Sequence, residues 1–224
     1  MSPMACFNRL CTREFVLMKR QFRVVVNAGL FFIMVMVFFP LTLPANPELL
    51  RLILPGIMWT ALLFTFFLSA ERLFQAEVDD GVLEQWLLST VPLSHYVRAK
   101  LLVHWGMIVL AFIIFCPVVS LLFHMNARET LILSASILLG TPTLVCVCAL
   151  AASFCSGINQ KGIFMTLILL PLSLPVMIFG GGTLTAGLQG LPVSGYFALL
   201  LAFSMVSFLF LPFAIAAALR AGAV

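Results

Sequence analysis

The chain has 224 residues, of which 63% are hydrophobic and only 9% are charged. A soluble domain carries roughly 25% charged residues, so this composition excludes a soluble globular protein. The net charge of +4 has to be read by its position along the chain, as in other membrane proteins, and it does not indicate nucleic-acid binding.

Residues 5–22 are predicted to form a basic amphipathic helix. Its apolar residues recur every three or four positions and share one helical face, with arginines roughly opposite. A helix of this kind lies in the membrane interface, and the alternative is a short soluble leader. We expect the apolar run that follows to remain attached as the first span. The residues of the apolar face are Phe7, Cys11, Phe15, Met18 and Phe22, and the opposite residues are Arg9, Arg13 and Arg20.

Long uncharged stretches then predict six membrane-spanning helices. About 20 residues are needed to cross roughly 30 Å of hydrocarbon, and a helix satisfies its own backbone polar groups there. The runs do not alternate as barrel strands would. The predicted fold class is therefore an all-α integral membrane protein, with residues 1–224 forming a single transmembrane domain. The spans are predicted at residues 24–43, 53–70, 101–123, 130–155, 162–180 and 196–219.

The distribution of lysine and arginine predicts the orientation, because basic residues accumulate in cytoplasmic segments. One side has only Arg51 and Arg128, and the other side has the remaining ten of the twelve basic residues. Both termini are therefore expected in the cytoplasm. The ten residues are Arg9, Arg13, Lys19, Arg20, Arg23, Arg72, Arg98, Lys100, Lys161 and Arg220.

The second cytoplasmic segment, residues 71–92, is rich in acidic residues. It contains five of the eight acidic residues of the chain: Glu71, Glu77, Asp79, Asp80 and Glu84. This segment is expected to be a docking site for a cytoplasmic partner, and the alternative is a hydrated turn with an interfacial helix.

A short helix is predicted inside this segment. Asp79 and Asp80 can cap its start with their carboxylates, and Gly81 permits a tight turn. The helix would be apolar on one face and would end before Pro92. The residues of that face are Leu83, Trp86 and Leu87.

The predicted spans contain no Asp, Glu, Lys or Arg. Ion-coupled transporters usually place ionisable groups at membrane depth, and intramembrane hydrolases need positioned acids, bases or metal ligands. The chain also has no G-x-x-x-x-G-K-[ST] nucleotide loop. We therefore expect no enzyme activity in this chain, and any nucleotide that drives it would be bound by another polypeptide. A membrane or lipid-modifying enzyme and a passive scaffold for other subunits are the alternatives.

Seven segments, spread along nearly the whole chain, form a joint pattern that is more specific than any one piece. The segments are FFP at 38–40, LPGIMW at 54–59, ERLFQAEVDDGVLEQWLL at 71–88, AKLLVHW at 99–105, GTPTL at 140–144, LPLSLPVMIFG at 170–180 and FAIAAALR at 213–220. This pattern resembles permease subunits of ABC-2-type transporters, and more specifically the haem exporter protein B family (CcmB) of bacterial cytochrome c maturation.

The resemblance implies a non-catalytic subunit of the bacterial inner membrane that pairs with a second copy of itself and with two copies of the ATPase CcmA, which binds ATP. CcmC and CcmD would associate with this core, and the complex would deliver haem to apocytochromes c through the chaperone CcmE. Haem export and ATP-driven release of haem-loaded CcmE are both implied, with a non-transporting scaffold as the alternative. The resemblance also implies that the helix at 5–22 is a connecting helix and that 180–195 is a periplasmic loop. Segment 71–92 would be the coupling helix, acting through Glu71, Asp79, Asp80, Gly81, Leu83, Glu84 and Leu87.

Haem ligands are only weakly indicated. Haem iron takes axial His, Met, Cys or Tyr ligands, and the weak candidates are His104 and His124, near the two ends of the third predicted span. His104, with Trp105 beside it, is interpreted as marking an interfacial position. No cofactor or metal is expected to be bound by this chain, and haem would enter only as a substrate.

Overall fold

The computed structural model describes residues 3–20, 22–44, 46–71, 73–88, 91–155 and 161–222. Within these ranges the chain forms nine α-helices and no strand. The helices are α1 (Pro3–Arg20), α2 (Phe22–Thr42), α3 (Pro47–Ala70), α4 (Gln75–Asp79), α5 (Val82–Leu87), α6 (Leu93–Leu122), α7 (Ala127–Phe154), α8 (Lys161–Leu188) and α9 (Ser194–Gly222).

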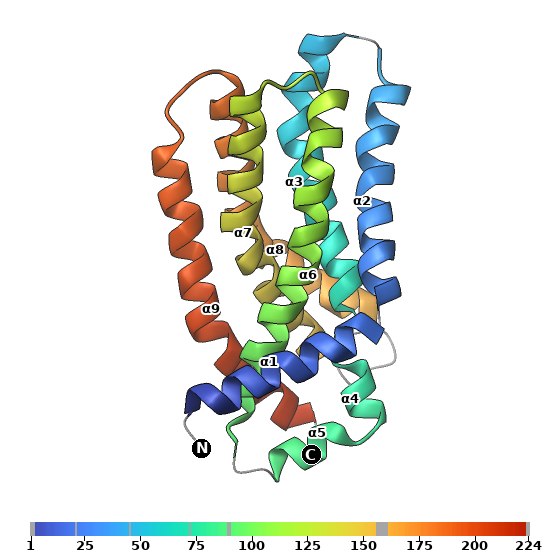
Figure 1. The fold of residues 1–224 in the computed structure, drawn as a ribbon, viewed down its shortest axis with the longest axis vertical. Coiled ribbons are helices and arrows are strands. Elements are labelled where there is room, and N and C mark those ends of the chain that lie inside the picture. Colours follow the sequence, from blue (N-terminus) through green and yellow to red (C-terminus); the bar gives the residue numbers. More distant parts are fainter. Residues whose placement is uncertain are drawn as a thin grey trace.

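Six of the helices in the described ranges are long and apolar enough to cross a membrane: α2, α3 and α6 to α9. They run side by side as an up-and-down bundle, with both chain ends at the end of the bundle that carries α1, α4 and α5 (Figure 1). We call this the α1 end. The all-α fold with six spanning helices is therefore confirmed.

The helices are longer than the predicted spans, and one loop prediction is wrong. Residues 180–188 were expected to belong to a loop, but α8 continues to Leu188. The glycines here allow close packing: a Cβ on Gly182 would meet the Tyr196 ring at 2.8 Å, and one on Gly187 would meet Ile132 at 2.9 Å. Residues 189–193 alone connect α8 to α9.

Helix α7 forms the centre of the bundle. It and α3 are the most buried of the six long helices, whereas α2, α6, α8 and α9 keep most of their side chains on the outside. Small residues such as Gly140, Cys146 and Ala149 are fully or nearly fully buried on α7, which allows close approach of neighbouring helices. Large apolar side chains such as Leu30 and Met34 of α2 are exposed on the outside of the bundle.

Helix α1 crosses the bundle end and packs against α6 (Figure 1). Leu10 and Glu14 are buried beneath it, while Phe15 and Val16 are exposed. The amphipathic helix predicted at 5–22 is thus confirmed as a helix, although it ends at Arg20. The side chain of Phe22, which belonged to the predicted apolar face, lies outside the described residues.

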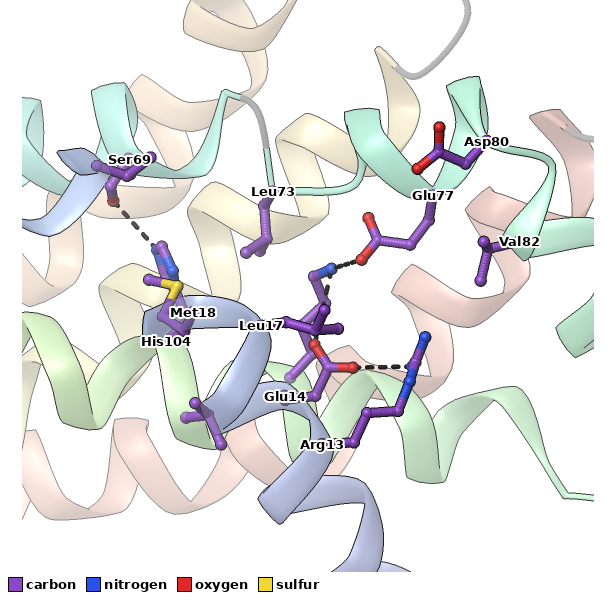
Figure 2. Close-up of a pocket in the computed structure, with 13 residues that line it drawn as sticks. Arg13, Glu14, Leu17, Met18, Ser69, Leu73, Glu77, Asp80, Val82 and His104 are labelled. Atoms are coloured by element: carbon purple, nitrogen blue, oxygen red, sulfur yellow. Dashed lines mark hydrogen bonds and ion pairs between the residues drawn. The ribbon is translucent and has the colours of Figure 1, made fainter. Parts of the chain in front are cut away.

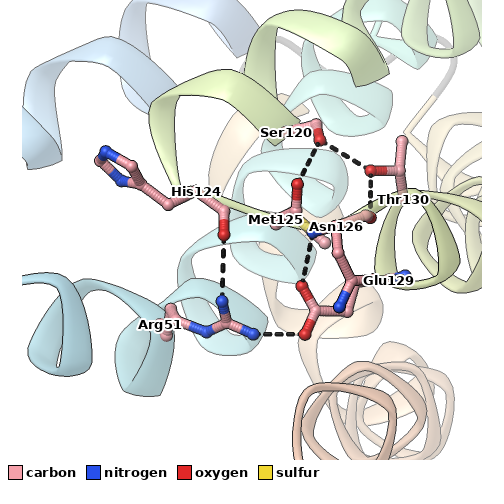
Figure 3. Close-up of polar contacts among 7 residues, drawn as sticks. All are labelled: Arg51, Ser120, His124, Met125, Asn126, Glu129 and Thr130. Atoms are coloured by element: carbon pink, nitrogen blue, oxygen red, sulfur yellow. Dashed lines mark hydrogen bonds and ion pairs between the residues drawn. The ribbon is translucent and has the colours of Figure 1, made fainter.

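Arg51 of α3 joins the turn between α6 and α7 at the opposite end of the bundle. Its guanidinium pairs with Glu129 and donates to the carbonyl of His124 at 3.0 Å (Figure 3). Glu129 and Asn126 also form a capping box, with hydrogen bonds of 2.9 Å in both directions. This polar network fixes the start of α7 against α3.

Candidate functional site at the α1 end of the bundle

Segment 71–92 contains two short helices, α4 and α5, instead of one. They are separated by a turn at Asp80 and Gly81, and Gly81 has φ +67°, a left-handed conformation that glycine adopts without strain. Gly81, and not Asp79 or Asp80, occupies the N-cap position of α5, which has no side-chain cap there. Asp79 is the last residue of α4. The tight turn predicted at Gly81 is confirmed.

The described side chains of this segment divide into an exposed and a buried set. Glu71, Asp80 and Glu84 are exposed, whereas Leu83 is buried and packs into the hydrophobic core. The side chains of Asp79 and Leu87 lie outside the described residues. Leu88, which the sequence analysis did not single out, is 88% exposed. We call Glu71, Asp80, Glu84 and Leu88 the acidic surface.

Behind this surface, a buried lysine of α6 joins the segment to α1. The ammonium of Lys100 forms an ion pair with Glu77 of α4 and lies 3.9 Å from the carboxylate of Glu14 in α1. Tyr96 donates its hydroxyl to Glu77 at 3.0 Å and accepts from Lys100 at 3.2 Å. We call Glu14, Glu77, Tyr96 and Lys100 the Lys100 cluster, and Figure 2 shows the carboxylate of Glu14 paired with Arg13.

Aromatic contacts connect α5 to the same cluster. The Trp86 ring stacks on Tyr96 with centroids 4.8 Å apart, and the guanidinium of Arg13 lies 5.6 Å from the centre of the Trp86 ring. Arg13 is in turn paired with Glu14 at 3.0 Å. Helices α1, α4, α5 and α6 therefore meet through one continuous set of polar and aromatic contacts.

A small cavity, lined by both charged and apolar side chains, opens within the cluster. It has a volume of about 270 Å³, and its lining includes Arg13, Glu14, Asp80, Lys100 and His104 (Figure 2). This is below the roughly 300–1,000 Å³ of typical small-molecule sites, so the cavity suits water better than a large substrate. Burial raises the pKa of Glu14, and the nearby charges of Lys100 and Arg13 only partly offset this effect.

The two histidines considered as haem ligands are far apart. His104 is buried and shares a 3.1 Å hydrogen bond with Ser69 of α3, so its ring faces the interior of the bundle. His124 is exposed at the turn after α6. At a helical rise of about 1.5 Å per residue, their separation along α6 is roughly 30 Å. One iron could not be bound by both.

Glu14 and Lys100 were missed as site residues, although the sequence carries a signal for one of them. Glu14 follows Phe7 by two helical turns, so it lies on the face predicted to be apolar. An acid on such a face needs a buried cationic partner. Which cation it meets depends on the packing of α1 against α6, and periodicity does not encode that packing.

Comparison with known proteins identifies the family. Residues 5–222 match the model of the family described as "CcmB protein". The chain belongs to the CcmB family. The match covers nearly all of α1, both short helices and all of α9, so the Lys100 cluster and the acidic surface lie within the CcmB domain.

Curated relatives of this CcmB chain bear the name "Heme exporter protein B". The one from Pseudomonas aeruginosa is 39% identical over 96% of each chain. Those from Haemophilus influenzae and Escherichia coli K12 are each 36% identical, the former over 96% of this chain and 97% of the relative, and the latter over 88% and 89%.

Proposed function

We propose that this CcmB chain is the permease subunit of an ABC complex that delivers haem for periplasmic c-type cytochrome biogenesis. The observation that carries the proposal is the α1 end itself. It presents exposed acidic side chains and an exposed leucine around α4 and α5. The Lys100 cluster behind them joins these two short helices to α6. The names of the relatives support haem as the substrate.

In this proposal the α1 end faces the cytoplasm of a bacterium with an inner membrane. The excess of lysine and arginine in the segments at this end supports that orientation. Helix α1 would then lie at the cytoplasmic interface, with Phe15 and Val16, which are exposed, in contact with lipid. CcmA, which binds and hydrolyses ATP, would dock on the acidic surface.

The resemblance to the CcmB family supports the remaining partners of the proposed complex. A second copy of the chain and a second CcmA would complete the core, and CcmC, CcmD and indirectly CcmE would join it. ATP hydrolysis would drive either export of haem or release of haem-loaded CcmE. The chain itself would have no catalytic role, since its part is to pass the movement of the ATPase to the spans.

Charge reversal on the acidic surface tests this function. The double substitution Asp80→Lys/Glu84→Lys changes two exposed side chains and leaves Leu83 in the core. We expect co-purification of CcmA to fall at least ten-fold and the yield of c-type cytochromes to fall with it. The measurements are a detergent pull-down from cells that express the whole gene set and haem staining of periplasmic cytochromes.

Gln189→Lys, at an exposed position between α8 and α9, is the matched control and should leave both values unchanged. Unchanged CcmA binding in the Asp80→Lys/Glu84→Lys variant would contradict the docking role. Intact CcmA binding, with a normal cytochrome yield after the ATPase is inactivated in CcmA, would favour the passive scaffold instead.

A further inference from the structure

Lys100 is the centre of the contacts at the α1 end. It is buried, with 8% of its surface exposed, and its ammonium contacts side chains of α1, α4 and α6: Glu14, Glu77 and Tyr96. The same ammonium lies 5.6 Å from the ring centre of Phe74, in the turn before α4. The side chain of Lys100 therefore joins its own helix, α6, to two other parts of the chain: α1 and the α4 region.

The energetics make these contacts interdependent. Moving an ammonium out of water without a partner of opposite charge is strongly unfavourable in free energy. The same holds for a buried carboxylate without a cation or hydrogen-bond donors. Glu14, 4% exposed, has Lys100 and Arg13 as its cationic neighbours among the described residues. If α1 or α4 moved away from α6 by itself, buried charge would be left unpaired. Helices α1, α4 and α6 are therefore expected to move together.

The aromatic contacts extend this linkage to α5. Trp86 stacks on Tyr96 and lies near Arg13, so α5 is held from the α6 side and from the α1 side. Leu88, beside the C-terminus of α5, is exposed at the acidic surface. A partner that displaces α5 would thus act directly on Tyr96, and through Glu77 and Lys100 on α1.

We propose that Lys100 is a positioning residue that joins α1 and the α4–α5 segment to α6, so that displacement of the acidic surface moves α1 and α6 as one unit. This rests on the proposed function, in which CcmA causes the displacement. Lys100 does not bind CcmA or the substrate. It transmits the movement of the acidic surface to α1 and to the spanning helix α6.

The test uses Lys100→Met in the complete complex, because methionine keeps the length of the side chain and removes its charge. We expect CcmA to co-purify within two-fold of wild type and ATP hydrolysis to continue, while the cytochrome yield falls at least ten-fold. Lys100→Arg, which retains a cation, should recover at least half of the yield. Lys19→Met is the matched control, since Lys19 is an exposed cation on α1 that contacts the Phe15 ring.

Hydrogen exchange separates positioning from mere stability. In the wild-type complex, a non-hydrolysable ATP analogue should change exchange in both segment 73–88 and α1. In Lys100→Met the change should persist in segment 73–88 and become much smaller in α1, where the contact of Arg13 with Trp86 remains. If Lys100→Met does not accumulate, Glu14→Gln replaces it, because that variant weakens the α1 contact and leaves the pair of Lys100 with Glu77 intact.

The outcomes distinguish this proposal from the proposed function. A normal cytochrome yield and an unchanged response of α1, in Lys100→Met or in its Glu14→Gln replacement, would overturn the role of Lys100 and leave the docking of CcmA standing. Loss of CcmA from Lys100→Met would also overturn it, because Lys100 would then be needed for docking itself. If Asp80→Lys/Glu84→Lys retains CcmA, the proposed function fails regardless of Lys100.

Discussion

The indole of Trp59 in α3 occupies the space that a side chain on Gly180 of α8 would need. Trp59 is 1% exposed, and a Cβ at either Gly180 or Gly140 of α7 would overlap its ring. Three segments that carry the family resemblance, 54–59, 140–144 and 170–180, thus meet at one side chain. The glycines allow α7 and α8 to pack around the indole from two sides.

Substitution of Gly180 should therefore destabilise the bundle. Gly180→Ala adds a methyl group where the ring already lies, and overpacking of this kind typically costs about 1–3 kcal/mol. We expect a lower unfolding temperature and a lower yield of monodisperse protein in detergent.

Gly181→Ala is the matched control, because nothing lies within 4 Å of a Cβ at that position. It should leave stability unchanged or raise it slightly, since alanine is the better helix former. Equal effects of the two substitutions would show that the contact of Gly180 with Trp59 does not limit packing.

The sequence predicted the six spans because crossing a bilayer is a local requirement on length and polarity. The helix at the N-terminus was equally predictable from its period. The wrong prediction arose where packing against other helices determines the structure. The glycines around Gly180 and Gly182 were assigned to a loop, although they lie in α8 and accommodate the rings of Trp59 and Tyr196.

The candidate site was predicted only in part, for the same reason. Local composition identified Asp80, Glu84 and the turn at Gly81, all within one segment. The pairing of Lys100 with Glu14 joins residues that are far apart in the sequence, and Glu14 stands alone among basic residues. The burial of both groups results from how α1 crosses α6, which no local pattern specifies.

The pair of Arg51 and Glu129 is expected to stabilise the end of the bundle opposite α1. Arg51→Met leaves the buried carboxylate of Glu129 without its cation, although the capping box with Asn126 remains. Because the Arg51 side chain is 33% exposed, we expect a loss of about 1–3 kcal/mol, below the full cost of breaking a buried pair. Thermal unfolding in detergent measures it.

A double-mutant cycle isolates this contact. Glu129→Gln keeps the capping-box geometry, since glutamine serves at that position, and the double variant with Arg51→Met should be less destabilised than the sum of the single variants. Glu48→Gln is the control, because Glu48 is an exposed acid on α3, the helix of Arg51. Simple additivity would mean that Arg51 acts through its hydrogen bond to the carbonyl of His124 alone.

The raised pKa of Glu14 predicts a pH dependence of stability. Burial is the main cause of the increase, so the folded state binds this proton more tightly than the unfolded state does. The stabilisation from this group is fully present below its ordinary pKa and is lost as pH rises through the higher folded value. Glutamine does not titrate, so Glu14→Gln is the reference. Relative to it, the unfolding temperature of wild type should fall between the ordinary pKa of a glutamate and the higher folded-state pKa of Glu14, and should then level off.

Unfolding temperatures of both proteins between pH 4.5 and about 7.5 test this sign. Glu48→Gln is again the control, because it makes the same substitution at an exposed acid of α3 outside the Lys100 cluster. A wild-type stability that rises with pH relative to Glu14→Gln would mean that the ion pairs with Lys100 and Arg13 outweigh burial.

The orientation of the bundle is the condition on which docking depends, and cysteine labelling measures it. In a cysteine-free background, Gln85→Cys of α5 and Gln189→Cys between α8 and α9 place single thiols at exposed positions on opposite ends. Because ten of the twelve basic residues belong to segments at the α1 end, that end should remain in the cytoplasm. A membrane-impermeant maleimide should then label Gln189→Cys in intact spheroplasts and Gln85→Cys only in inverted vesicles. The reverse pattern would place the acidic surface in the periplasm, where no ATPase could reach it.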